Sequence, residues 1–118
     1  MDEVAPAKLF ELLADEYARE ILAQANCEPM SARQLAAACN AHHSTIYRRI
    51  EELENFDLLI GQQRLDPEDG HHFTVYRTTM EEITVHLDRD QYVVALRRTE
   101  DPIDRMATMW RQLRGEEG

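Results

Sequence analysis

The chain has 118 residues, of which 23 are Asp or Glu and 13 are Lys or Arg, so its formal net charge is −10 at pH 7. This length suits one domain with a single hydrophobic core and excludes two well-packed domains. No run approaches the ~18 apolar residues of a membrane helix, and MDEVAPAK lacks the basic and then apolar order of a signal peptide. We therefore expect a cytoplasmic protein that spans no membrane.

The acidic residues are interleaved with periodic apolar residues, which indicates a solvated surface rather than a disordered tail. Lys8 is the only lysine beside twelve arginines. This depletion of lysine resembles the composition of proteins from halophilic archaea that accumulate salt, where molar salt shortens the Debye length to ~3 Å and makes self-repulsion tolerable. We expect a cytoplasm of high salt.

A long helix is the first predicted element, over residues 6–25, because Pro6 is a favoured first-turn residue. Apolar residues recur at spacings of three and four along it, which puts them on one face. This face is expected to belong to the core, and its residues are Phe10, Leu13, Tyr17 and Ile21.

A capping box predicts the second helix, over residues 32–39, since Ser31 is followed three residues later by Gln34. Its inward residues would be Leu35, Ala36 and Cys39.

The third helix is predicted over residues 43–55, after a turn at Asn40 and Ala41. Its buried side would carry Ile46, Ile50 and Leu53. Two helices joined by so short a turn must cross steeply.

Two β-hairpins are predicted next. Residues 58–65 and 73–78 are β-prone and are separated by the turn-forming segment DPEDGHH. Residues 83–87 and 92–96 form a second pair of short alternating runs, with DRDQ as the turn. A last helix over residues 101–114 begins at Asp101 and Pro102. Its apolar positions form a narrow seam, typical of a helix that packs on a partner helix: Ile103, Met106, Trp110 and Leu113, with Met109 at the edge.

Three helices followed by a hairpin is the order of a winged helix-turn-helix. LADEYAREIL resembles the opening signature of ArsR-type archaeal regulators, and STIYRRIEELENFDLLI resembles their recognition helix running into the wing. The resemblance covers about residues 8–78, and the whole chain resembles a haloarchaeal member of the ArsR/PadR-like group. The expected fold is therefore α+β: a winged helix-turn-helix with an extra short β-hairpin over residues 1–98, and a dimerisation helix over residues 99–118.

The resemblance implies a stress-responsive transcription regulator, a homodimer that binds double-stranded DNA at a pseudo-palindromic promoter operator. Since the apolar side of the third helix must face inward, the polar residues of its first half are left for the major groove or its phosphates. These are His42, His43, Ser44, Thr45, Tyr47, Arg48 and Arg49. The alternative is that the arginines form helical ion pairs with Glu51, Glu52 and Glu54.

The first hairpin offers further polar groups for DNA, although Asp66, Glu68 and Asp69 lie between them. They are Gln62, Gln63, Arg64, His71, His72 and Arg77. We expect the acidic tip to turn away from DNA or to be screened by bound cations such as K⁺, the only cofactor expected.

The dimer interface is expected on the seam of the last helix, at Ile103, Met106, Met109, Trp110 and Leu113. The alternative is that this helix packs on the core of its own chain. Both alternatives for the last helix leave the predicted three-helix unit and the first predicted hairpin unchanged.

Catalysis and metal binding have little support in the sequence. A phosphate-binding Gly-rich loop, a nucleophile elbow and HExxH are all missing, and the third helix holds no cysteine for a thiolate metal sensor. A histidine-only site would need ligands from loops and helices that need not converge. Cys27 and Cys39 are expected to be small, partly buried thiols. The competing function is a winged-helix adaptor that contacts proteins and not DNA.

Overall fold

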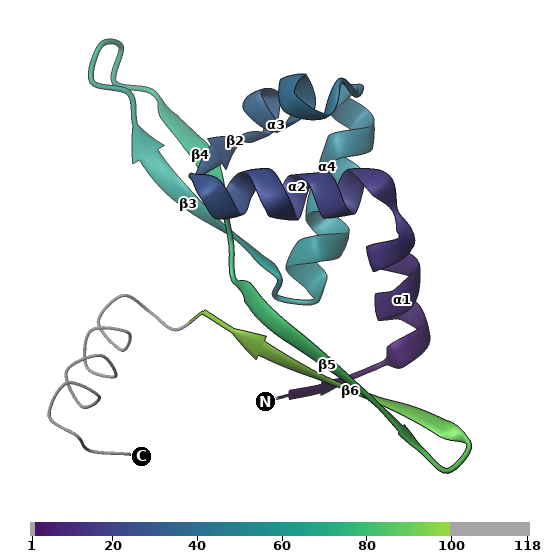
Figure 1. Ribbon diagram of the computed structural model, residues 1–118. Coiled ribbons are helices and arrows are strands. Elements are labelled where there is room, and N and C mark those ends of the chain that lie inside the picture. Colours follow the sequence, from purple (N-terminus) through teal and green to yellow (C-terminus); the bar gives the residue numbers. More distant parts are fainter. Residues whose placement is uncertain (1, 100–118) are drawn as a thin grey trace, which may run out of the picture.

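The computed structural model describes residues 2–99, which form an α+β unit of four helices and two three-stranded antiparallel sheets (Figure 1). The helices are α1 (Pro6–Ala14), α2 (Glu16–Cys27), α3 (Ala32–Cys39) and α4 (His43–Asn55). The strands are β1 (Asp2–Val4), β2 (Met30–Ser31), β3 (Leu59–Leu65), β4 (His72–Thr78), β5 (Met80–Asp88) and β6 (Gln91–Arg98).

The predicted first helix is in fact two helices, α1 and α2, because the chain breaks at Asp15. Asp15 has extended backbone angles (φ −77°, ψ 125°), and its carboxylate accepts a 2.8 Å hydrogen bond from the backbone N–H of Ala18. A side chain that caps a new helix in this way competes with continuation of the old one. The predicted core face across residues 10–21 is therefore confirmed only at Ile21, which is buried, whereas Leu13 and Tyr17 are half-buried. It is wrong at Phe10, which is exposed, because α1 buries Leu9 and Leu12 instead.

The two helices that follow have the predicted bounds. Ser31 and Gln34 form the predicted capping box, with Gln34 N to Ser31 Oγ at 3.2 Å and Ser31 N to Gln34 Oε1 at 2.8 Å. Asn40 ends α3 in the left-handed conformation (φ 52°), which asparagine tolerates better than most residues.

The predicted inward positions of these two helices are confirmed. Leu35 and Ala36 are buried and Cys39 is half-buried on α3, and the inner face of α4 is buried at Ile46, Ile50 and Leu53.

The first predicted hairpin is confirmed as β3 and β4, which pair in antiparallel register from Leu59↔Thr78 to Leu65↔His72. The sheet also contains β2, which the sequence analysis missed and which gives the strand order β2-β4-β3. Thr78 is buried, and its hydroxyl donates a 2.7 Å hydrogen bond to the carbonyl of Leu22. That bond ties the base of the hairpin to α2.

The second predicted hairpin is confirmed as β5 and β6, and both strands are longer than predicted. β1, also missed from the sequence, pairs with β6, so the strand order of this sheet is β1-β6-β5. Val94 and Leu96 of β6 are 1% exposed and belong to the same core as the helices. Figure 1 shows the two hairpins extending from opposite ends of the helical unit.

The predicted last helix and its five interface residues (Ile103, Met106, Met109, Trp110 and Leu113) lie outside the described residues. Within residues 2–99, no helix is long and apolar enough to cross a membrane.

Candidate nucleic-acid interface

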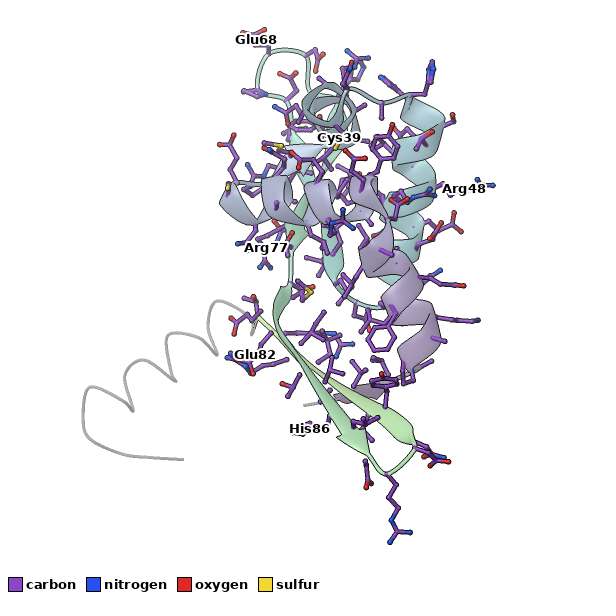
Figure 2. The ribbon with its side chains drawn as sticks, turned by 45° about the vertical axis from the view of Figure 1, so that its right-hand side comes forward. Cys39, Arg48, Glu68, Arg77, Glu82 and His86 are labelled. Carbon is purple, nitrogen blue, oxygen red and sulfur yellow. The ribbon has the colours of Figure 1, made fainter. Side chains whose placement is uncertain are left out.

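The outward side of α4 carries a polar stripe in its first half. Ser44, Tyr47 and Arg48 are exposed, with Tyr47 at 55%, because the buried residues of α4 occupy the opposite side. Figure 2 shows Arg48 extending away from the helical unit. Thr45, which was predicted with them, is half-buried. This half of the helix therefore presents hydroxyls and one guanidinium to solvent.

Arg49 has a different environment from its neighbour Arg48. Its Nε lies 2.8 Å from Asp15 Oδ2, and its Nη1 lies 3.4 Å from Glu52 Oε1. The hydrogen bond with Asp15 raises the pKa of Arg49, and the same bond lowers the pKa of Asp15. The ion-pair alternative weighed in the sequence analysis thus applies to Arg49. Among residues 2–99, no carboxylate lies within 4.0 Å of the guanidinium of Arg48.

A hollow of about 410 Å³ lies at the elbow between α3 and α4. Its lining includes Arg33 on α3 and His42 and His43 at the start of α4, all three of them exposed. Among the described residues, no side chain caps α4, and its first turn contains no acidic residue. The free N–H groups of a helix start attract anions. Arg33 was not predicted as a site residue, although its place two residues after the Ser31 cap puts it in the first turn of the helix that leads into the elbow.

The second half of α4 is acidic on the same outward side. Glu51 and Glu54 are exposed, one and two turns after Tyr47. Tyr76 of β4 has a pKa raised by burial and then by the nearby Glu54 and Tyr47. Tyr76 is therefore the residue of the β3–β4 hairpin whose pKa responds to groups on the outward side of α4.

The register of this hairpin divides the predicted polar residues between two faces. Residues opposite each other in an antiparallel pair share a face, so the pairs Gly61↔Tyr76, Gln63↔Thr74 and Leu65↔His72 lie on the side of Tyr76. The other face holds Gln62, Arg64 and Arg77. In Figure 2, Arg77 and Arg48 lie on opposite sides of the helical unit. The structure therefore does not bring Gln62, Arg64 and Arg77 together with the outward stripe of α4.

The tip of the hairpin combines the histidines with carboxylates. Asp69 Oδ1 accepts a 2.9 Å hydrogen bond from the backbone N–H of His71, and Asp69 Oδ2 lies 3.4 Å from His71 Nδ1. Asp66 Oδ1 accepts a 2.9 Å bond from the backbone N–H of Glu68, which lies at the outer end of the tip in Figure 2. Asp66 and Asp69 therefore stabilise the turn, and Asp69 lies beside one of the two histidines of the tip.

The described part of the chain holds few groups suited to thiol or metal chemistry. Cys39 is half-buried as expected, and burial raises the pKa of its thiol, with a smaller effect from Glu20. Cys27 is exposed, contrary to expectation. Residues 2–99 hold no group of three or more His, Cys, Asp or Glu side chains placed to bind a metal ion.

In comparisons with known proteins, no family model matches the chain, and no curated protein matches it. The function is therefore inferred from the geometry of α3, α4 and the β3–β4 hairpin. That geometry offers hydrogen-bond donors and cationic groups along one helix, whose start has no side-chain cap within the described residues. Such a surface can bind an extended anion.

Proposed function

We propose that this chain is a sequence-specific regulator of transcription that binds double-stranded DNA as a homodimer in a high-salt cytoplasm. We propose further that it is a winged helix-turn-helix protein of the ArsR/PadR-like type. In this proposal α3 and α4 are the helix-turn-helix, α4 is the recognition helix, and the β3–β4 hairpin is the wing.

The observation that carries the proposal is the polarity of α4. Its first half exposes Ser44, Tyr47 and Arg48, and the exposed carboxylates begin only at Glu51. A recognition helix contacts base edges with its N-terminal residues, and the major groove is about 12 Å wide, which admits one α-helix. An acidic protein can approach DNA in this orientation because its carboxylates on α4 stay further from the groove.

Each exposed group has a role that suits its chemistry. Arg48 would donate two hydrogen bonds to a guanine, a contact worth about 1–3 kcal/mol against the wrong base. Ser44 and Tyr47 would hold a phosphate or touch a thymine methyl. Arg33 and His43, at the elbow hollow, would hold the phosphate that meets the start of α4.

Two predicted contacts are reassigned. Arg49 is proposed as a structural residue, because its guanidinium is shared between Asp15 and Glu52. On the wing, the face that holds Gln63, Thr74 and His72 would meet DNA, since it is the face of Tyr76, whose pKa is affected by Glu54 and Tyr47 of α4. Arg64 and Arg77 lie on the other face.

A gel shift tests the proposal, with the chain in molar KCl and the DNA upstream of its own gene as probe. Arg48→Ala should weaken specific binding by about tenfold or more, the value of one bidentate contact. The control is Arg89→Asn in the β5–β6 turn, which removes one positive charge far from α4. Asparagine tolerates the left-handed conformation of that position (φ 59°). Equal affinities for wild type and Arg48→Ala would remove the assignment.

A protein-binding adaptor is the second candidate, and exposed apolar residues on the hairpin favour it. Leu65 is 57% exposed and Phe73 42% exposed. The pairs Leu65↔His72 and Arg64↔Phe73 put these side chains on opposite faces of the hairpin, so each face would offer a partner protein its own apolar side chain. A complete lack of a shift at every salt concentration, with the chain folded, would select this candidate over DNA binding.

A further inference from the structure

A cleft of about 550 Å³ lies between α1 and the second half of α4. Its α1 wall carries Lys8, Glu11, Leu12 and Asp15. These positions recur at helical spacing and therefore lie on one side of α1 and its C-terminal cap. Pockets that hold small molecules have volumes of about 300–1,000 Å³, so the cleft is large enough for one.

The α4 wall carries Arg49, Glu52 and Phe56, at spacings of three and four. This is a different side of α4 from the outward stripe that is proposed to meet DNA. Leu12 is 4% exposed and Phe56 is half-buried, so the two walls also supply apolar surface to the cleft. A molecule bound here would leave the outward stripe free.

The ion pair of Asp15 and Arg49 bridges the two walls, with 2.8 Å between Oδ2 and Nε. From this bridge the α1 wall extends seven residues back to Lys8, or about 10.5 Å at the rise of a helix. The α4 wall reaches Glu52 three residues after Arg49, or about 4.5 Å from the bridge. Because α1 and α4 run in opposite directions (Figure 1), both walls lead away from the bridge on the same side. Lys8 and Glu52 are therefore anchored about 6 Å apart along the cleft.

Lys8 and Glu52 keep unused charge. Among residues 2–99, no carboxylate lies within 4.0 Å of the Lys8 ammonium. Glu52 contacts Arg49 through Oε1 at 3.4 Å, and no hydrogen bond within the described part of the chain reaches its Oε2. Asp15 and Arg49, by contrast, are committed to each other, since their hydrogen bond lowers the pKa of Asp15 and raises the pKa of Arg49.

We propose that this cleft binds a small zwitterion whose ammonium and carboxylate groups are separated by a short methylene chain. The carboxylate of the ligand pairs with the ammonium of Lys8, and Oε2 of Glu52 accepts a hydrogen bond from the ammonium of the ligand. The methylene chain between them lies on Leu12 and Phe56. The separation of Lys8 and Glu52 along the cleft is what calls for a chain between the two charged groups.

The charges of the walls favour a zwitterion over an ion of one sign. An anion drawn to Lys8 would also meet the carboxylates of Glu11 and Glu52, and a cation drawn to those carboxylates would meet Lys8. In molar salt, where the Debye length is ~3 Å, a single exposed ion pair contributes little. A ligand held at both ends and along its chain combines two ion pairs with an apolar contact.

Nuclear magnetic resonance of the ¹⁵N-labelled full chain in molar KCl, without DNA, tests the inference with four probes. 4-Aminobutanoate should shift the amide signals of residues 8–15 and 49–56 and reach saturation. Butanoate and butylamine each lack one charged group and should bind about tenfold more weakly or worse. Glycine, whose charges are too close together, should also bind more weakly. No saturable shift with 4-aminobutanoate, or equal binding of any other probe, would overturn the inference.

Two pairs of variants test the assigned contacts. Lys8→Gln should weaken binding of 4-aminobutanoate about tenfold and leave binding of butylamine unchanged, because butylamine has no carboxylate. Arg89→Asn in the β5–β6 turn removes the same charge elsewhere and should have no effect. Glu52→Gln should weaken both 4-aminobutanoate and butylamine, whereas Glu51→Gln at the next, exposed position should weaken neither. An unchanged affinity for 4-aminobutanoate in Lys8→Gln or Glu52→Gln would overturn the contact assigned to that residue, and with it the zwitterion.

This site is independent of the proposed DNA binding. Its residues lie away from the outward stripe, and the titration contains no DNA. A chain that binds 4-aminobutanoate but shifts no DNA contradicts only the proposed function, whereas a chain that shifts DNA but does not bind the probe contradicts only the site between α1 and α4.

Discussion

Asp15 and Arg49 are joined by a 2.8 Å hydrogen bond between Oδ2 and Nε, although 34 positions separate them in the sequence. The same carboxylate oxygen caps α2 at the N–H of Ala18. One side chain therefore both ends α1 and ties the α1–α2 junction to α4. The orientation of the proposed recognition helix depends in part on this contact.

Two changes at Asp15 separate its two roles. Asp15→Asn keeps a good capping residue but removes the charge, whereas Asp15→Ala removes both. The ion pair is partly exposed, with side chains 22% and 25% accessible, so Asp15→Asn should lower the free energy of unfolding by no more than about 1 kcal/mol. Asp15→Ala should cost about 1 kcal/mol more. Denaturant unfolding at constant salt measures both, and equal losses would show that the cap contributes nothing.

Stability should fall in acid because of the same carboxylate. The bond from Arg49, with help from the N–H of Ala18, holds the pKa of Asp15 below its usual value of about 3.9 in an unfolded chain. The charged form is therefore favoured by folding. Its contribution is fully present above pH ~4 and is lost as the pH falls through the lowered pKa. The drop in unfolding free energy below pH ~4 should be smaller in Asp15→Asn, and an identical pH profile would contradict this origin.

The α3–α4 segment was predictable because its signals are local. The capping box at Ser31 and Gln34 lies within one turn of the helix it starts, and the inward residues of α4 follow a regular spacing. The start of α2 was missed because the apolar spacing continues through Asp15. The local signal was Asp15 itself, which caps α2 at the N–H of Ala18. Only its second bond, from Arg49, is one that no local pattern reveals.

The candidate site was only partly predictable for a similar reason. Arg48 and Arg49 are neighbours of the same type, and only their environment separates an exposed guanidinium from a paired one. Side-chain direction on the hairpin depends on register, which fixes that Arg64 lies opposite Phe73 and away from the face of Tyr76. The strands β1 and β2 are too short for a sequence pattern and exist only through their partners.

Thr78 provides a test of the contact between the β3–β4 hairpin and α2. Its buried hydroxyl donates to the carbonyl of Leu22, so Thr78→Val keeps the shape of the side chain but leaves that carbonyl without this donor. A loss of about 1–3 kcal/mol in unfolding free energy is expected. Thr74→Val is the control, because the bond between Thr74 and Gln63 is exposed and should contribute less. Similar losses in the two variants would contradict a special role for the buried bond.

Arg33 and Arg48 should affect DNA binding in different ways. Arg33 lies at the elbow, where phosphate contact is proposed, so Arg33→Ala should weaken binding to the operator and to unrelated DNA by similar factors. Arg48→Ala should weaken operator binding more than unrelated binding, because a base contact is lost. Fluorescence anisotropy with both duplexes gives the ratio. An unchanged ratio in Arg48→Ala would assign that residue to phosphate as well.

The dependence of DNA affinity on salt is the sharpest test of the proposal that this acidic chain binds a polyanion. Ordinary binding releases condensed cations, so affinity falls steeply with salt, by a slope of about −0.9 per phosphate contact. Carboxylates at the wing tip would instead take up cations when they approach phosphates. We therefore expect a weak or positive slope of log affinity against log KCl concentration, and a steep negative slope would contradict this mechanism.

Glu68 is the residue whose removal should change that slope. It lies at the outer end of the tip, and Glu68→Gln preserves the backbone bond from its N–H to Asp66. The variant should take up fewer cations, which makes the slope more negative by up to about one unit per bound chain. Glu11→Gln on α1 removes the same charge from an exposed position far from the hairpin and should leave the slope unchanged. Equal shifts in the two variants would mean that net charge, rather than the wing tip, sets the salt dependence.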